Sequence, residues 1–142
     1  MAILEVNNVK KIYTARFGSN RVQALSDVSF SVEEGEYVAV MGESGSGKTT
    51  LLNIIAALDK PTDGEVCLNG RRFSDIKEAE IAKFRREHLG FVFQEFNLLD
   101  NFSIKDNILL PLVLAGKQYH EMDKRLTPVA RKLGISEILS KY

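Results

Sequence analysis

The chain has 142 residues, with 19 Lys plus Arg against 19 Asp plus Glu, so its formal net charge at pH 7 is zero. Its content of 44% hydrophobic and 27% charged residues is typical of a globular domain and excludes intrinsic disorder as the main state of the chain. A neutral chain has no long-range field that would attract DNA or RNA, and we therefore expect no nucleic-acid partner.

The N-terminal part of the chain predicts extended segments. Residues 3–9 predict a first strand, and residues 23–32 predict a second extended stretch in which apolar and polar residues partly alternate. A turn cluster at residues 18–20 separates them. Residues 37–41 are wholly apolar, which is typical of a strand buried on both faces of a parallel sheet, and they run directly into glycine-rich sequence.

The middle of the chain predicts two helices and two short strands. Residues 49–58 show an apolar helical pattern, and residues 65–68 predict a short strand that the turn Asn69-Gly70 closes. Residues 78–87 have a helix-favouring composition, and residues 89–93 predict a second buried strand. We assign all segments up to residue 95 to one predicted domain, residues 1–95.

The remainder, residues 96–142, predicts helices. Ser103, with Asp106 three residues later, resembles a capping box and opens a helix that runs to about residue 114. Residues 121–133 predict a further helix, which Gly134 ends.

One motif carries chemistry, and it matches G-x-x-x-x-G-K-[ST] in full between a predicted strand and a predicted helix. Its residues are Gly42, Glu43, Ser44, Gly45, Ser46, Gly47, Lys48 and Thr49. The glycines permit backbone angles that turn successive N–H groups inward, making an anion-binding nest at the positive end of the helix. Lys48 can reach the β- and γ-phosphates, and the Thr49 hydroxyl can ligate Mg²⁺. This P-loop (residues 42–49) predicts a nucleoside triphosphate with magnesium; the alternative is a loop that is glycine-rich only for turning.

The spacing of four sequence features resembles ABC-type ATPase cassettes: Tyr13, the P-loop, Thr50-Leu51-Leu52 and Gly90-Phe91-Val92-Phe93-Gln94. Residues 58–64 and 92–99 look most like the branch that exports lipoproteins, macrolides and antimicrobial peptides. The resemblance implies an α/β fold. Its parts would be a P-loop NTPase core, an antiparallel β subdomain at the N-terminus, the start of a helical subdomain and an incomplete parallel sheet.

The resemblance also implies roles for individual residues. Tyr13 matches the aromatic residue that stacks on the adenine of ATP; the alternative is a packing residue. Gln94 matches the glutamine that contacts Mg²⁺ or the attacking water; the alternative is a polar residue at a strand end. The implied set has Lys48 and Gln94 as catalytic residues, Thr49 and Gln94 as Mg²⁺ contacts, and Tyr13, residues 42–49 and Thr50 as ATP contacts.

The resemblance calls for three further features: a Leu-Ser-Gly-Gly-Gln type signature, an apolar strand that ends in Asp-Glu, and a histidine that follows this strand. The 142 residues contain none of the three. We interpret the chain as the N-terminal portion of a longer protein, and we expect it to bind ATP without hydrolysing it. By the same resemblance, the intact protein would work with a second cassette and an integral membrane permease at the cytoplasmic face of the membrane. An unpaired sheet edge would lead this chain to self-associate.

Two other functions remain open from the sequence. A small P-loop kinase explains residues 42–49 but leaves Tyr13 and residues 90–94 unexplained, and no arginine-rich lid follows them. The chain could also be a non-catalytic nucleotide-binding module, which would differ from a transporter ATPase only in that it does not hydrolyse ATP.

Overall fold

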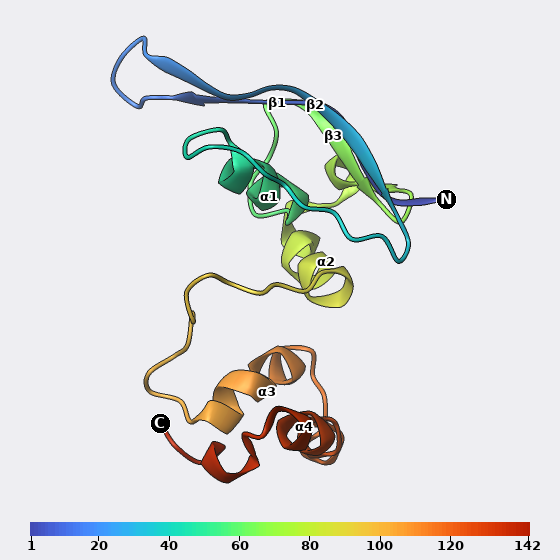
Figure 1. Cartoon of the computed structure of the whole chain (residues 1–142), viewed down its shortest axis with the longest axis vertical. Helices are drawn as coiled ribbons and strands as arrows, with labels where there is room; N and C mark the ends of the chain where they lie inside the picture. Colours follow the sequence, from blue (N-terminus) through green and yellow to red (C-terminus); the bar gives the residue numbers. More distant parts are fainter. The chain divides into compact units, whose positions relative to one another are not determined.

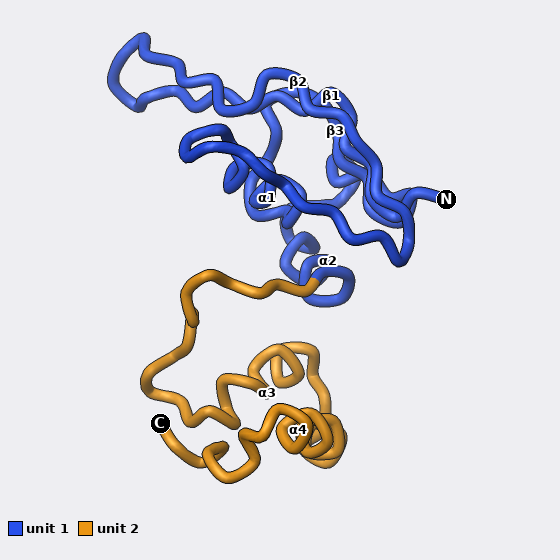
Figure 2. The backbone as a smooth tube through the Cα atoms, viewed as in Figure 1, with its two compact units in different colours: residues 1–89 blue, residues 90–142 orange.

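The computed structural model describes all 142 residues (Figure 1). The chain forms two compact units, unit 1 from Met1 to Leu89 and unit 2 from Gly90 to Tyr142 (Figure 2), and each is described by itself.

Unit 1 is built on an antiparallel sheet of four strands in the order β2-β1-β3-β4. Strands β1 (Ala2–Thr14) and β2 (Arg21–Glu33) form a long hairpin, which confirms the two predicted extended segments and lengthens both. Strand β3 (Asp63–Leu68) pairs with β1 on its other side and with the short β4 (Arg71–Arg72). Between β3 and β4, Asn69 and Gly70 have φ angles of 51° and 76°, as the predicted Asn-Gly turn requires.

The core of unit 1 lies between this sheet and helix α1 (Lys48–Ile55), which packs on one face of it (Figure 1). Residues three apart on a regular strand face opposite sides, yet Val6 and Val9 are both fully buried in this core. The register of β1 shifts between them, and Asn8 takes a φ of 49°, so the irregularity turns both side chains inward. The buried residues are Val6, Val9, Leu25, Leu51, Ile54 and Val66.

A second cluster in unit 1 holds helix α2 (Ile81–His88), which the short 3₁₀ turn Glu78–Glu80 precedes. Phe84 is buried with Leu68 and Ile76, and its ring meets that of Phe73 edge to face at 5.6 Å between centroids. The helix predicted over residues 78–87 is therefore confirmed with a tighter first turn.

Unit 2 contains helices α3 (Ile104–Leu114) and α4 (Tyr119–Leu133) and a 3₁₀ turn, Ser136–Ile138. The Ser103 hydroxyl accepts the Asp106 N–H at 3.1 Å and donates to the Asp106 carboxylate at 2.6 Å. This confirms Ser103 as the N-cap, although the carboxylate accepts from the Ser103 hydroxyl and not from the Ser103 N–H that completes a capping box. Gly134 ends α4 with a φ of 71°. The unit's own core consists of Leu109, Met122, Leu126 and Ala130. Neither these helices nor those of unit 1 combine the length and hydrophobicity that crossing a membrane requires.

The prediction of buried strands at residues 37–41 and 89–93 is wrong for this structure. Neither segment is a strand, and all of their side chains except that of the half-buried Leu89 are exposed: Tyr37 is 95% and Phe93 54% accessible to solvent. An apolar run becomes a strand only where a neighbouring segment completes its backbone hydrogen bonds, and every strand pair in this structure belongs to the antiparallel sheet. The expected parallel sheet is therefore not formed by these residues.

Candidate functional site

The P-loop enters α1 through Gly47, whose backbone is left-handed with a φ of 93°. A Cβ at this position would lie 2.6 Å from the Ala24 carbonyl oxygen and 2.9 Å from Leu25 Cδ2, so the loop can pass β2 this closely only with glycine. Gly45 also has a positive φ, 82°. Gly42 has no positive φ, and a Cβ at this position would lie 2.5 Å from the Ser46 hydroxyl, so a larger residue there would require the Ser46 side chain to move.

The loop folds around the ammonium of Lys48. Its Nζ donates to the carbonyl oxygen of Gly42 at 2.5 Å, to that of Glu43 at 2.6 Å and to the Ser46 hydroxyl at 3.2 Å. The Ser46 N–H donates in turn to the Glu43 carbonyl at 3.1 Å. The structure thus brings the predicted residues together and holds a positive charge within the loop.

A hollow of about 540 Å³ lies at the N-terminal end of α1. It is lined on one side by Ser44, Gly45, Gly47, Lys48, Thr49 and Thr50, and on the other by Val22, Gln23 and Ala24 of β2. Helix α1 begins without a side-chain cap and without an acidic residue in its first turn, so its first N–H groups have no side-chain acceptor. Free N–H groups, the helix dipole and the Lys48 charge suit this hollow to a polyanion.

Tyr13 lies beside this hollow. It pairs across the sheet with Val22, one of the residues that line the hollow, and the residue is 42% exposed. Its hydroxyl donates to Asp59 Oδ2 at 3.1 Å, and the Lys11 ammonium lies 5.1 Å from the ring centroid. Sequence reasoning did not single out Lys11 or Asp59, because 48 residues separate them and no local pattern links them.

Asp59 is the best-connected carboxylate near the predicted site. Burial acts to raise its pKa, but hydrogen bonds from Lys11, from the Lys60 N–H and from Tyr13, together with the charge of Lys11, lower the pKa overall. A carboxylate whose pKa is lower in the folded state stabilises the fold fully above its unfolded pKa of about 3.9, and this contribution is lost as pH falls through the folded pKa.

We therefore expect the free energy of unfolding of the wild type to fall more steeply below about pH 4 than that of Asp59→Asn, which has no carboxylate to protonate. Urea unfolding at pH 6 and pH 3 measures this difference. The same pH dependence in both proteins would mean that other groups control acid unfolding.

Gln94 belongs to unit 2, whereas the P-loop belongs to unit 1. It is exposed and lines a shallow hollow of about 500 Å³ together with its sequence neighbours Glu95, Phe96, Asn97, Leu98 and Asp100. Because Gln94 and the P-loop belong to separate units, the contact of Gln94 with Mg²⁺ or water stays a prediction.

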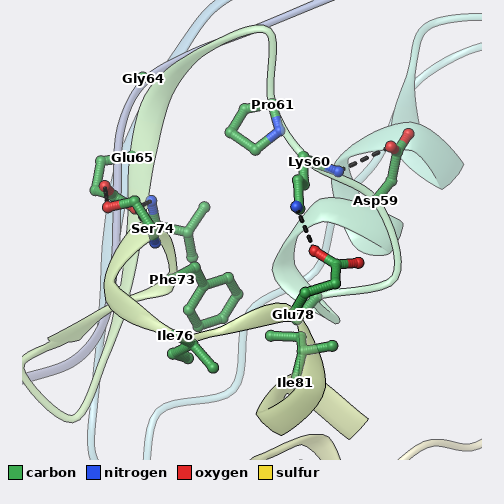
Figure 3. A pocket seen from close by; sticks show the side chains of 12 residues that line it. Asp59, Lys60, Pro61, Gly64, Glu65, Phe73, Ser74, Ile76, Glu78 and Ile81 are labelled. Atoms are coloured by element: carbon green, nitrogen blue, oxygen red, sulfur yellow. Dashed lines mark hydrogen bonds and ion pairs between the residues drawn. The ribbon is translucent and has the colours of Figure 1, made fainter.

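A second cavity in unit 1, of about 360 Å³, lies near the C-terminal end of α1 (Figure 3). Phe73, Ile76 and Ile81 contribute apolar side chains, and the ion pair between Lys60 Nζ and Glu78 Oε2, 2.6 Å long, lies at its rim. None of the residues predicted from the sequence as site residues lines it.

Comparison with known proteins places the sequence in a protein family. A family model described as "ABC transporter" matches residues 25–142. The chain is 50% identical over 139 residues to the ABC transporter ATP-binding protein YxdL of Bacillus subtilis (strain 168), covering 98% of this chain and 53% of that protein. It is 46% identical over 142 residues to the bacitracin export ATP-binding protein BceA of Halalkalibacterium halodurans, covering 100% and 55% respectively.

The fold is similar to that of the ATP-binding cassette MJ0796 of Methanocaldococcus jannaschii, solved as a dimer in a post-hydrolysis state bound to ADP and Pi. The TM-score is 0.85 at 37% sequence identity, and the match covers 98% of this chain and 60% of that chain. The chain thus spans about half the length of the curated relatives it matches.

Proposed function

Because the chain belongs to the ABC transporter family of ATP-binding proteins, we propose that it binds ATP and that the whole protein uses ATP to drive export through a membrane permease. The observation that carries this proposal is the P-loop itself, folded around the Lys48 ammonium at the rim of a hollow formed by the first turn of α1 and β2. A small P-loop kinase would leave the family match over residues 25–142 without explanation.

In the proposed complex, the phosphates of ATP lie against the N–H groups of the P-loop and of the first turn of α1, where Thr50 lies beside Thr49. The Lys48 ammonium contacts the β- and γ-phosphates. Thr49 lines the hollow, and its hydroxyl is of the oxygen type that Mg²⁺ prefers. Gln94 is a further proposed contact, and Mg²⁺ would supply positive charge to the phosphates when bound. Tyr13 stacks on adenine from the neighbouring strand.

We expect Tyr13→Ala to weaken Mg-ATP binding by about 1 to 3 kcal/mol and to leave the binding of magnesium tripolyphosphate unchanged, because only ATP offers a base to stack. Calorimetric titration of both ligands measures this difference. Tyr37→Ala, which removes an exposed tyrosine from the same unit, is the matched control and should alter neither affinity. Equal weakening of both ligands by Tyr13→Ala would make Tyr13 a structural residue.

We also expect this chain to bind nucleotide without turning it over, because none of its residues matches the glutamate that orients the attacking water in the family. Exposed apolar side chains at residues 37–41 and 91–99 favour self-association of the chain. Light scattering, with a phosphate-release assay at saturating Mg-ATP and Lys48→Ala as the contamination control, tests both expectations. A stable monomer with Lys48-dependent turnover would contradict them.

The partners of the whole protein follow from the same proposal. MJ0796 was solved as a dimer, and BceA is named for bacitracin export. We propose a second copy of the cassette and an integral membrane permease as partners, with the ATP-binding part at the cytoplasmic face of the membrane.

A further inference from the structure

We propose that Asp59 and Lys11 are positioning residues for the nucleotide base: they fix the ring of Tyr13 so that one face stays open for adenine. This inference rests on the proposed function, since it concerns the residue that contacts the base. Its basis is a cluster of contacts that joins β1 to the segment just after α1.

Both oxygens of the Asp59 carboxylate are used. Oδ1 accepts from Lys11 Nζ at 3.0 Å and from the Lys60 N–H at 2.8 Å, the second of which Figure 3 shows. Oδ2 accepts from the Tyr13 hydroxyl at 3.1 Å. Asp59 is itself fixed, because the N–H of its neighbour Lys60 and the ammonium of Lys11 in β1 both donate to it.

Lys11 is fixed as firmly. Its side chain is only 13% exposed, and Nζ also donates to the Lys60 carbonyl oxygen at 2.6 Å. The same ammonium lies over the Tyr13 ring at 5.1 Å from the centroid. One face of the ring is therefore covered by the partly buried Lys11 ammonium, and a base can stack only on the other face.

These contacts act on binding through the ring's freedom of motion. A tyrosine held by its hydroxyl and by a cation has already lost its side-chain freedom in the unliganded protein, so less entropy is lost when the base binds. Because Tyr13 pairs across the sheet with Val22, which lines the P-loop hollow, the backbone of Tyr13 lies next to the proposed phosphate site.

Asp59→Asn is the sharpest test, because the amide keeps the shape and one acceptor. If the amide nitrogen takes the place of Oδ2, the bond to the Tyr13 hydroxyl is kept only with its direction reversed and without the carboxylate charge; if it takes the place of Oδ1, it opposes Lys11 Nζ and the Lys60 N–H. Either orientation weakens the contacts that hold the ring. We expect the affinity for Mg-ATP to fall about three- to tenfold, with the affinity for magnesium tripolyphosphate unchanged.

Three further variants make the result specific. Tyr13→Phe removes only the hydroxyl and should give a similar loss for ATP alone. Asp59→Asn in a Tyr13→Ala background should cause no additional loss, because the ring through which Asp59 acts is gone. Glu78→Gln makes the same change from carboxylate to amide at the residue that forms an ion pair with Lys60 Nζ. It should leave the affinities for Mg-ATP and for magnesium tripolyphosphate as in the wild type.

The outcomes separate this inference from the proposed function. If the wild type binds ATP in a Lys48-dependent way but Asp59→Asn and Tyr13→Phe match it for both ligands, the positioning role is overturned and the ATP site stands. Equal weakening of ATP and tripolyphosphate by Asp59→Asn would also overturn it, since that is the effect of a structural residue. If the wild type binds neither ligand, the proposed function and this inference fall together.

Discussion

Lys48→Ala is expected to abolish measurable Mg-ATP binding without unfolding the protein. The ammonium is the one charged group whose hydrogen bonds all go to the P-loop, with Gly42, Glu43 and Ser46 as acceptors. Its removal takes away both the cation for the β- and γ-phosphates and the centre around which the loop folds. We expect a loss of about 3 kcal/mol or more, which is a factor of at least about one hundred in affinity.

Calorimetric titration with Mg-ATP measures the loss, and far-UV circular dichroism shows whether the fold is kept. Lys83→Ala is the matched control: it removes an exposed lysine of α2 whose only recorded partner is Glu87, one helical turn away. Lys48→Ala and the wild type binding with equal affinity would refute the assignment of residues 42–49 as the phosphate site.

The second large effect is expected for Gly47→Ala, on stability. An alanine at a φ of 93° is strained, and its Cβ would also press against the Ala24 carbonyl, so we expect a loss of about 3 kcal/mol in the free energy of unfolding. Gly35→Ala isolates the effect of backbone strain, because Gly35 has a φ of 79° and no atom lies close to the position of its added Cβ.

Urea unfolding of both variants separates strain from collision. Gly35→Ala should lose only about 1 kcal/mol. If both variants lose the same free energy of unfolding, the P-loop can move away from β2 without an energetic penalty, and this contact does not hold the loop in place.

Local signals in the sequence predicted local structure well. The Ser103 helix start, the Gly134 helix end and the Asn69-Gly70 turn each depend on residues within a few positions of one another, and all three are confirmed. Their chemistry acts over one turn of chain, so no knowledge of the rest of the fold is needed.

Features that depend on distant residues could not be predicted in this way. The apolar run at residues 37–41 has the composition of a buried strand, but a strand also needs a partner, which the run itself does not specify. The irregularity at Asn8 is set by the demands of packing against α1. For the candidate site, the motif predicted which residues gather in the P-loop, whereas the contact of Lys11 with Asp59 required the folded chain.

Helix α1 has only eight residues, fewer than a helix needs to persist alone in water. It is held at its start by the passage of Gly47 against Ala24, and just beyond its end by the ion pair of Asp59 with Lys11. Both attachments are to the β1–β2 hairpin, so the persistence of this short helix depends on the hairpin and not on its own hydrogen bonds alone.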